Sequence, residues 1–292
     1  MRFGLVGTGP WAMLAHGPGL GSAEGVELVG VWGRNPAKAR ALAGTLAVSA
    51  YEDYAAMLDD VDAVAFAVPP DVQAPMAVRA AGAGKHLLLD KPIALTAAEA
   101  KDLADVVAAS GVASVVFFTD RFAPESREWL ATVGEQGGWH GGWVRMLASL
   151  DAPGNPFANS PWRRTYGALW DIGPHALSNL TATLGPITDL TAVGGAGDLV
   201  HLVIRHESGA TSTASLSLFA PAEGSSFETA VWGEGGTRYA PVKTTPAEAS
   251  LAVAASELVA AAGSGRAHPA GVDLGVRVVE LLADAEAQLR RA

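Results

Sequence analysis

The sequence predicts an α/β protein in which a doubly wound parallel sheet is followed by a second α/β domain built on a large, mostly antiparallel open sheet. In residues 1–118, short apolar runs rich in Val, Leu and Phe alternate with Ala-rich stretches of helical spacing. That alternation is typical of parallel strands joined by crossover helices. Beyond residue 119, several segments alternate between apolar and polar residues, which indicates antiparallel strands with one open face.

The first half contains five expected strands and four expected helices. Apolar runs predict strands over 2–6, 27–32, 63–68, 86–89 and 113–118, and helical spacing predicts helices over 37–43, 54–58, 72–83 and 97–109. Thr96 and Glu99 form a capping box that marks the start of the last helix. These elements predict a first domain of residues 1–119.

The second half begins with an expected helix over 125–133 and a strand over 144–150, followed by a loop rich in Pro and Asn over 155–162. A helix is expected over 169–184, then strands over 190–194, 199–206, 211–219 and 227–232, and two final helices over 246–262 and 272–290. We expect the final helices to pack beside the second sheet or back on the first domain. Residues 120–292 therefore form an expected second α/β domain.

Composition excludes several classes of function. The 292 residues include no cysteine, which excludes disulfides, thiolate metal sites and cysteine catalysis. Lys and Arg number 20 against 30 Asp and Glu, and without a basic stripe we expect no nucleic-acid partner. The start has no signal-peptide pattern and no run reaches 18 apolar residues, so we expect a cytoplasmic protein without membrane association.

A glycine turn lies between the first expected strand and the first helical stretch. Gly7-Thr8-Gly9-Pro10-Trp11-Ala12 matches G-x-G-x-x-A in this context. The first glycine permits the tight turn, the second lets the backbone approach a pyrophosphate, and the final small residue lets helix and strand pack closely. The sequence therefore predicts a Rossmann-type domain that binds a nicotinamide dinucleotide.

The end of the second expected strand indicates which dinucleotide binds. In many such domains an acidic residue there holds the ribose 2′-hydroxyl. Here a glycine, Gly33, is followed by Arg34 and Asn35, which can bind a 2′-phosphate. We therefore expect NADP, with NAD possible, because Gly33 can also be a turn residue and Arg34 a solvated charge or a residue that stacks on adenine. The candidate cofactor-binding residues are Gly7, Thr8, Gly9, Pro10, Trp11, Ala12, Gly33, Arg34, Asn35, Val68, Pro69, Asp90 and Lys91.

The segment Leu89-Asp90-Lys91-Pro92 resembles the Glu-Lys-Pro motif of the Gfo/Idh/MocA family of oxidoreductases. The resemblance covers nearly the whole chain. Further matching motifs are Gly84-Lys85-His86, Arg121-Phe122-Ala123-Pro124, Trp162-Arg163 and Asp171-Ile172-Gly173-Pro174-His175. It implies a dehydrogenase or reductase that acts on a hydroxyl or carbonyl carbon of a sugar, inositol or related polyol.

The resemblance also implies that Lys91, Asp171 and His175 surround the nicotinamide ring. Histidine is a suitable base for a hydroxyl proton because its ordinary pKa is about 6.5. Asp171 and His175 are four residues apart in an expected helix, so they share one face and can act on one ligand. Lys91 follows a strand, at the edge where open α/β sheets bind ligands, and could orient or polarise the substrate oxygen or relay its proton.

Three more residues are candidate substrate contacts. Arg121 and Arg163 can bind substrate or cofactor, or form ion pairs at the domain junction. Trp170 can line a pocket or belong to the core. His86 is interpreted as structural. No serine-nucleophile motif and no cluster with metal-ligand spacing is present, so we expect neither a serine hydrolase nor a metal site.

Some positions depart from the family pattern. Asp90 replaces the usual glutamate, residues 163–168 are shorter than the usual loop and lack its glycine run, and Ser178 stands where many members carry an aspartate. Two alternatives therefore stay open. One is a non-catalytic regulator that binds the cofactor, and the other is elimination or glycoside cleavage assisted by the cofactor.

The Ser- and Thr-bearing strands of the second domain predict a sheet face without covering helices. The resemblance implies that such a face forms a subunit interface. We therefore expect a homodimer or homotetramer, with Trp143, Phe219 and Trp232 as candidate anchors.

Overall fold

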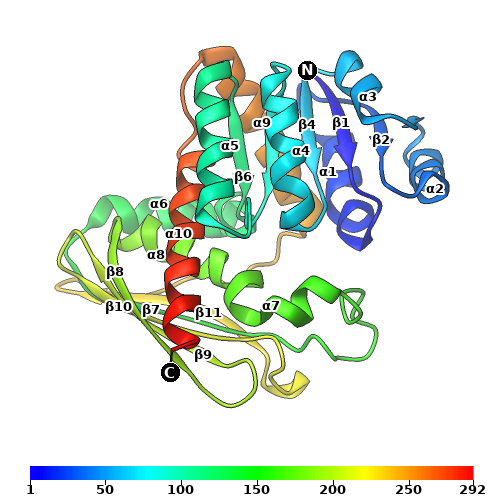
Figure 1. Cartoon of the computed structure of the whole chain (residues 1–292). Coiled ribbons are helices and arrows are strands. Elements are labelled where there is room, and N and C mark those ends of the chain that lie inside the picture. The colour runs from blue at the N-terminus through cyan, green and yellow to red at the C-terminus, as the bar shows by residue number, and fades with distance from the viewer. Residues whose placement is uncertain (292) are drawn as a thin grey trace. The chain divides into compact units, whose positions relative to one another are not determined.

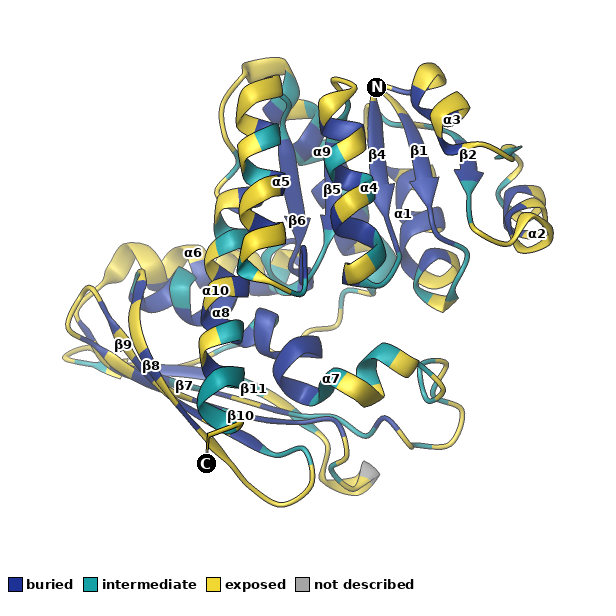
Figure 2. Ribbon diagram, viewed as in Figure 1, coloured by how far each residue is buried: buried dark blue, intermediate teal, exposed yellow. Residues whose placement is uncertain are grey.

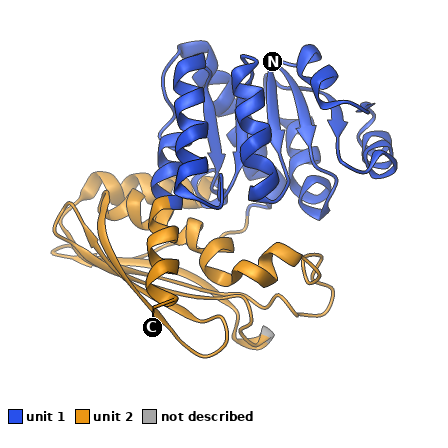
Figure 3. Ribbon diagram, viewed as in Figure 1, with its two compact units in different colours: residues 1–123, 245–279 blue, residues 124–244, 280–292 orange. Residues whose placement is uncertain are grey.

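The computed structural model describes residues 1–291 and divides into two compact units. Residues 1–123 and 245–279 make the first unit, and residues 124–244 and 280 onwards make the second (Figure 3). The second unit thus begins a few residues beyond the boundary expected from the sequence, and a segment near the C-terminus returns to the first unit.

Six parallel strands form the sheet of the first unit, in the order β3-β2-β1-β4-β5-β6 (Figure 1). The strands are β1 (Arg2–Val6), β2 (Glu27–Trp32), β3 (Ser49–Tyr51), β4 (Ala63–Phe66), β5 (His86–Asp90) and β6 (Ser114–Phe117). β1 pairs with β2 on one side and with β4 on the other, so the strand order reverses there. Open α/β sheets bind ligands beside such a reversal, at the carboxyl ends of the strands.

Helices cover both faces of this sheet, which confirms the doubly wound fold. They are η1 (Ala12–His16, a π-helix), α1 (Gly17–Ser22), α2 (Pro36–Leu46), α3 (Tyr54–Asp60), α4 (Pro70–Gly82), α5 (Ala97–Ser110), η2 (Thr119–Arg121) and α9 (Ala247–Ser264). Figure 1 shows α4 and α5 on the near face and α1 and α9 behind, and both pairs are in contact. The expected cap is confirmed, since Thr96 Oγ1 accepts a hydrogen bond from Glu99 N at 3.2 Å.

The core of the first unit lies between sheet and helices, and Figure 2 shows its central strands buried along most of their length. Close packing of α9 on α1 depends on Gly19, because a Cβ there would lie 2.7 Å from the carbonyl oxygen of Glu248. The expected return of a C-terminal helix to the first domain is therefore correct for α9. The last helix, α10 (Val272–Leu289), contributes residues to both units.

The sheet of the second unit also has six strands, in the order β12-β11-β7-β10-β9-β8. They are β7 (Trp139–Leu147), β8 (Ile187–Gly194), β9 (Val200–His206), β10 (Thr211–Ser217), β11 (Ser226–Gly233) and β12 (Gly236–Tyr239). β7 and β10 are parallel and the other pairs are antiparallel. Every second residue of β9 is buried, as expected for a sheet with one open face.

The helices of the second unit are α6 (Pro124–Gln136), α7 (Pro161–Asp171) and α8 (Gly173–Leu184), with a short 3-10 turn, η3 (Ala222–Gly224). α8 contacts β7 and β10, and α7 contacts β10. The single helix expected over 169–184 is wrong. Helix α7 ends before Ile172 and α8 begins after it, because Pro174 lacks the N–H group that a continuous helix would use as a hydrogen-bond donor.

Other differences from the expected elements are local. The expected loop gives way at Pro161 to helix α7, and β3 and β12 were not expected. Both strands are very short and lie at sheet edges, so neither contains enough residues to show a strand pattern in the sequence. Within residues 1–291, no helix is both long and apolar enough to cross a bilayer.

Candidate active site

The turn after β1 has the geometry that the glycine motif predicts. Gly7 has φ of 132°, and a Cβ there would lie 2.4 Å from the carbonyl oxygen of Ala67. Only glycine fits this combination of conformation and contact. A Cβ on Gly9, in contrast, would meet nothing within 4 Å, so this part of the backbone is open to a ligand.

A pocket of about 290 Å³ adjoins the turn within the first unit. Its lining includes eight of the residues expected to bind the cofactor: Gly7, Thr8, Gly9, Gly33, Arg34, Asn35, Val68 and Pro69. Pro10, Trp11, Ala12, Asp90 and Lys91 are outside this lining. Four lining residues were missed, namely Trp32, Lys38, Ala67 and Val72. Lys38 could have been found from its place in the first turn of the helix that Asn35 begins.

The segment after β2 contributes Gly33, Arg34, Asn35 and Lys38 to the pocket lining. A Cβ on Gly33 would lie 2.6 Å from Thr8 Cγ2, so a carboxylate at this position would require the Thr8 side chain to move. Arg34 and Lys38 are both exposed at the pocket. Asn35 Oδ1 caps α2 by accepting a hydrogen bond from Lys38 N at 3.1 Å, which leaves the NH₂ group of Asn35 as its donor to a ligand.

The Asp-Lys-Pro turn closes β5. Lys91 N donates to Asp90 Oδ1 at 2.8 Å, so the carboxylate that replaces the family's glutamate helps to shape the turn. Lys91 lies directly beyond the carboxyl end of the strand, as expected.

A buried histidine, His16, lies close to this turn and was not singled out from the sequence. Its Nε2 is 3.9 Å from Asp90 Oδ2, and the rings of Trp11 and Phe117 meet it edge-on. Burial lowers the pKa of His16 to about 3. The ring is therefore neutral near neutral pH and is not a charged partner for Asp90.

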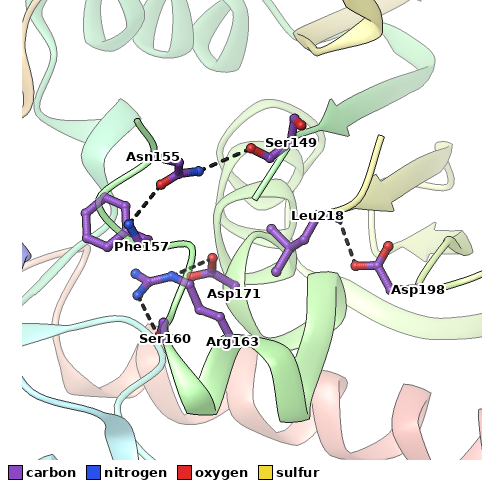
Figure 4. Close-up of polar contacts among 8 residues, drawn as sticks. All are labelled: Ser149, Asn155, Phe157, Ser160, Arg163, Asp171, Asp198 and Leu218. Atoms are coloured by element: carbon purple, nitrogen blue, oxygen red, sulfur yellow. Dashed lines mark hydrogen bonds and ion pairs between the residues drawn. The ribbon is translucent and has the colours of Figure 1, made fainter. Parts of the chain in front are cut away.

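In the second unit, the structure brings Arg163 and Asp171 into contact (Figure 4). Arg163 Nε donates to Asp171 Oδ2 at 2.9 Å, and Arg163 Nη1 lies 3.4 Å from Ser160 Oγ. The guanidinium carbon is also 4.5 Å from the ring centre of Phe157 and 4.9 Å from that of Trp162. Two aromatic rings and a hydroxyl thus fix the guanidinium against the carboxylate.

The backbone of Gly167 allows this contact. Residues eight apart on a straight helix are separated by about 12 Å along its axis. Gly167 has φ of 62° and ψ of −161° inside α7, a conformation that is essentially restricted to glycine. The resulting kink lets Arg163 reach Asp171. The expected short loop over 163–168 is therefore a kinked helix.

His175 lies in the first turn of α8, and its N–H donates to Ile172 O at 3.1 Å. Asp171 ends α7, so the two residues are on consecutive helices rather than on one helical face. Both belong to the second unit, whereas Lys91 belongs to the first.

The remaining candidates have distinct surroundings. Arg121 ends η2 in the first unit, and burial lowers its pKa to about 10. Trp170 is fully buried, with its ring edge-on to Tyr166, which favours the core interpretation. His86 Nδ1 accepts a hydrogen bond from Ala113 N at 2.9 Å, as a structural residue would. Across the described part of the chain, no group of three or more His, Asp or Glu could hold a metal ion.

Replacing Arg163 with Gln should lower the free energy of unfolding by about 2 kcal/mol, because Asp171 would lose its charged donor while largely buried. Arg164→Gln is the matched control. The neighbouring arginine pairs with Asp151 at the exposed surface, and its loss should cost less than about 1 kcal/mol. Urea denaturation measures both values. Equal effects, or no recovery when Asp171→Asn is added to Arg163→Gln, would show that the pair is not coupled.

Comparison with known proteins identifies the family. The model described as "Oxidoreductase family, NAD-binding Rossmann fold" matches residues 1–118, and the one described as "GFO/IDH/MocA C-terminal domain" matches residues 134–238. A curated relative, dTDP-3,4-didehydro-2,6-dideoxy-alpha-D-glucose 3-reductase of Streptomyces violaceoruber, is 33% identical over 192 residues, which are 63% of this chain and 55% of that protein. The match thus spans little more than half of the relative's length.

A second relative, D-xylose 1-dehydrogenase (NADP(+)) 2 of Haloferax volcanii, is 32% identical over 127 residues, which are 42% of this chain and 39% of that protein. Two solved structures share the fold. A putative myo-inositol dehydrogenase from Sinorhizobium meliloti 1021 has a TM-score of 0.85 at 23% identity, covering 100% of this chain and 98% of that one. Levoglucosan dehydrogenase in complex with NADH and levoglucosan has a TM-score of 0.87 at 19% identity, with coverage of 100% and 97%. The chain therefore belongs to the Gfo/Idh/MocA family of oxidoreductases.

Proposed function

We propose that this protein is an NADP-dependent oxidoreductase that transfers a hydride between the nicotinamide and a hydroxyl or carbonyl carbon of a sugar-like or polyol molecule. The observation that carries the proposal is the pocket beside the glycine turn. Two exposed cationic side chains, Arg34 and Lys38, lie at the end of the pocket where NAD-binding domains carry an acidic residue that holds the ribose. The pocket lining includes no Asp or Glu.

The preference for NADP follows from charge and space. A guanidinium fork and an ammonium can both bind a 2′-phosphate. A larger side chain at Gly33 would have to displace the Thr8 side chain. One relative is named as an NADP-dependent xylose dehydrogenase, whereas the levoglucosan dehydrogenase structure holds NADH, so both cofactors occur among similar proteins.

When bound, the nicotinamide accepts a hydride from an alcohol carbon or returns one to a carbonyl carbon. His175 takes the hydroxyl proton in the oxidative direction and returns it in the reductive direction. The Lys91 ammonium orients the substrate oxygen and stabilises negative charge on it. Asp171, held by Arg163, accepts hydrogen bonds from substrate hydroxyl groups.

A sugar-like substrate fits the chemistry around Asp171. The Arg163–Asp171 pair places donors beside acceptors, as neighbouring hydroxyl groups require. The named relatives include a deoxysugar reductase and a xylose dehydrogenase. These observations favour a polyhydroxylated substrate.

NADPH should bind at least tenfold more tightly than NADH, a difference of about 1.4 kcal/mol. Arg34→Ala and Lys38→Ala should each remove most of that preference by weakening NADPH binding, with little effect on NADH. Arg40→Ala is the control, because Arg40 pairs with Glu52 outside the pocket lining. Tryptophan fluorescence titration gives all the dissociation constants. A preference for NADH would overturn the assignment of NADP.

Turnover should appear as a change in the absorbance of the reduced nicotinamide with at least one of D-xylose, glucose 6-phosphate, myo-inositol or levoglucosan. His175→Asn should lower kcat by roughly 10²-fold or more, because the proton acceptor is removed. NADPH that binds tightly but is never consumed would instead indicate a regulator. Bound oxidised cofactor without net consumption during product formation would indicate elimination or glycoside cleavage.

We also infer that a second copy of the chain covers the open face of the second sheet. The strand register aligns Val203, Thr213, Trp143 and Tyr239 in one row across that face, with Ala230 buried in the same row. The adjacent row carries Arg145 and Glu228, which form an ion pair with each other. The first row therefore exposes the side chain of Val203 and the ring of Tyr239 next to this ion pair, which suits contact between two copies of the chain. Phe219, in contrast, follows the end of β10 and lies beside Arg164.

Light scattering should give the mass of a dimer or tetramer, and Val203→Glu should dissociate it by placing a charge in the apolar row. Val242→Glu provides a control at an exposed loop residue outside the sheet. A monomeric wild-type protein would contradict the inferred interface, as would identical dissociation by both substitutions.

A further inference from the structure

Gln73, on α4, is fully buried and binds the backbone of the Asp-Lys-Pro turn through both atoms of its amide. Asp90 N donates to Gln73 Oε1 at 2.8 Å, and Gln73 Nε2 donates to Asp90 O at 2.8 Å. The same Nε2 lies 3.2 Å from Pro92 O and 3.3 Å from Ile93 O. A single side chain therefore binds the turn both before and after Lys91.

The lengths of the neighbouring strands explain why a side chain is needed here. β4 pairs with β5 only as far as Ala65 and Leu88, whereas β6 pairs with β5 as far as Asp90. On the β4 side, the backbone of Asp90 thus extends beyond its strand partner. Buried backbone N–H and C=O groups need partners. The amide of Gln73 supplies a donor and an acceptor to Asp90, as another strand would.

We propose that Gln73 is a positioning residue for Lys91. Its amide fixes the backbone on both sides of the lysine and thereby sets where the ammonium is held. The consequence for catalysis rests on the proposed function of Lys91, but the effect on the lysine itself does not. Displacing a catalytic group by about 1 Å can cost roughly 100-fold in rate.

Gln73→Met tests this, because methionine has a similar length and offers no amide. We expect kcat to fall roughly 100-fold, with the NADPH dissociation constant changed less than about twofold, since Gln73 is outside the pocket lining. Gln288→Met is the matched control. Gln288 makes the same type of two-atom contact with β8, accepting from Ala192 N at 2.9 Å and donating to Leu190 O at 3.0 Å. That variant should lose stability without a change in kcat.

A second readout needs no substrate. The chain has five lysines, Lys38, Lys85, Lys91, Lys101 and Lys243, so reductive ¹³C-methylation gives few NMR signals. Lys91→Arg assigns the signal of Lys91. Gln73→Met should shift that signal and leave the other four unchanged, whereas Gln288→Met should leave all five unchanged. If the wild-type protein turns over no substrate, the proposed function fails while this signal still tests the inference.

Gln73→Glu covers the case in which the methionine variant does not fold. Buried glutamate is protonated there, so it keeps the acceptor for Asp90 N but has a single O–H donor for the three carbonyl groups in place of two N–H donors, and the Lys91 signal should still shift and kcat should still fall. A folded variant at position 73 with the wild-type Lys91 signal and wild-type kcat would overturn the proposal.

Discussion

The close approach of Gly7 to Ala67 is the contact on which the first unit's ligand site depends. A Cβ at position 7 would lie 2.4 Å from the Ala67 carbonyl oxygen, so the chain leaves β1 tightly against the end of β4 only because position 7 is glycine. Gly7 N also donates to Trp32 O at the end of β2. The turn is thereby held between the ends of β2 and β4, the two strands that pair with β1 on either side. Its open side faces the pocket that Arg34 and Lys38 line.

In the second unit, the ion pair between Arg163 and Asp171 depends on the backbone conformation of Gly167. The kink at Gly167 brings Arg163 back to Asp171, and Phe157 and Trp162 hold the guanidinium in place. Asn155 Oδ1 in turn accepts a hydrogen bond from Phe157 N, and Asn155 Nδ2 donates to Ser149 O, which orders the preceding loop (Figure 4). Contacts between residues close in sequence thus order the loop and the helix that carry Arg163 and Asp171.

Particular residues show how far prediction from the sequence reached. Eight of the expected cofactor residues line one pocket. They could be predicted because the glycine motif and the residues directly after each apolar run are recognisable in short stretches of sequence. The prediction that Asp171 and His175 share one helical face was wrong. The apolar spacing of a helix continues through Pro174, whereas the backbone hydrogen bonding of α7 does not continue into α8. Gln73 and His16 were missed, because a polar residue inside an Ala-rich stretch gives no sign of which distant backbone or carboxylate it meets.

The sequence by itself determined the doubly wound sheet, the mostly antiparallel second sheet and the dinucleotide turn, since each depends on residue periods and glycine positions over short stretches of the chain. Only the tertiary structure decided which polar side chains support Lys91 and Asp171. β4 ends before β5, which leaves a place for the Gln73 amide, and Gly167 bends α7, which lets Arg163 reach Asp171. The first depends on the relative lengths of neighbouring strands and the second on one backbone angle, and no local residue pattern encodes either.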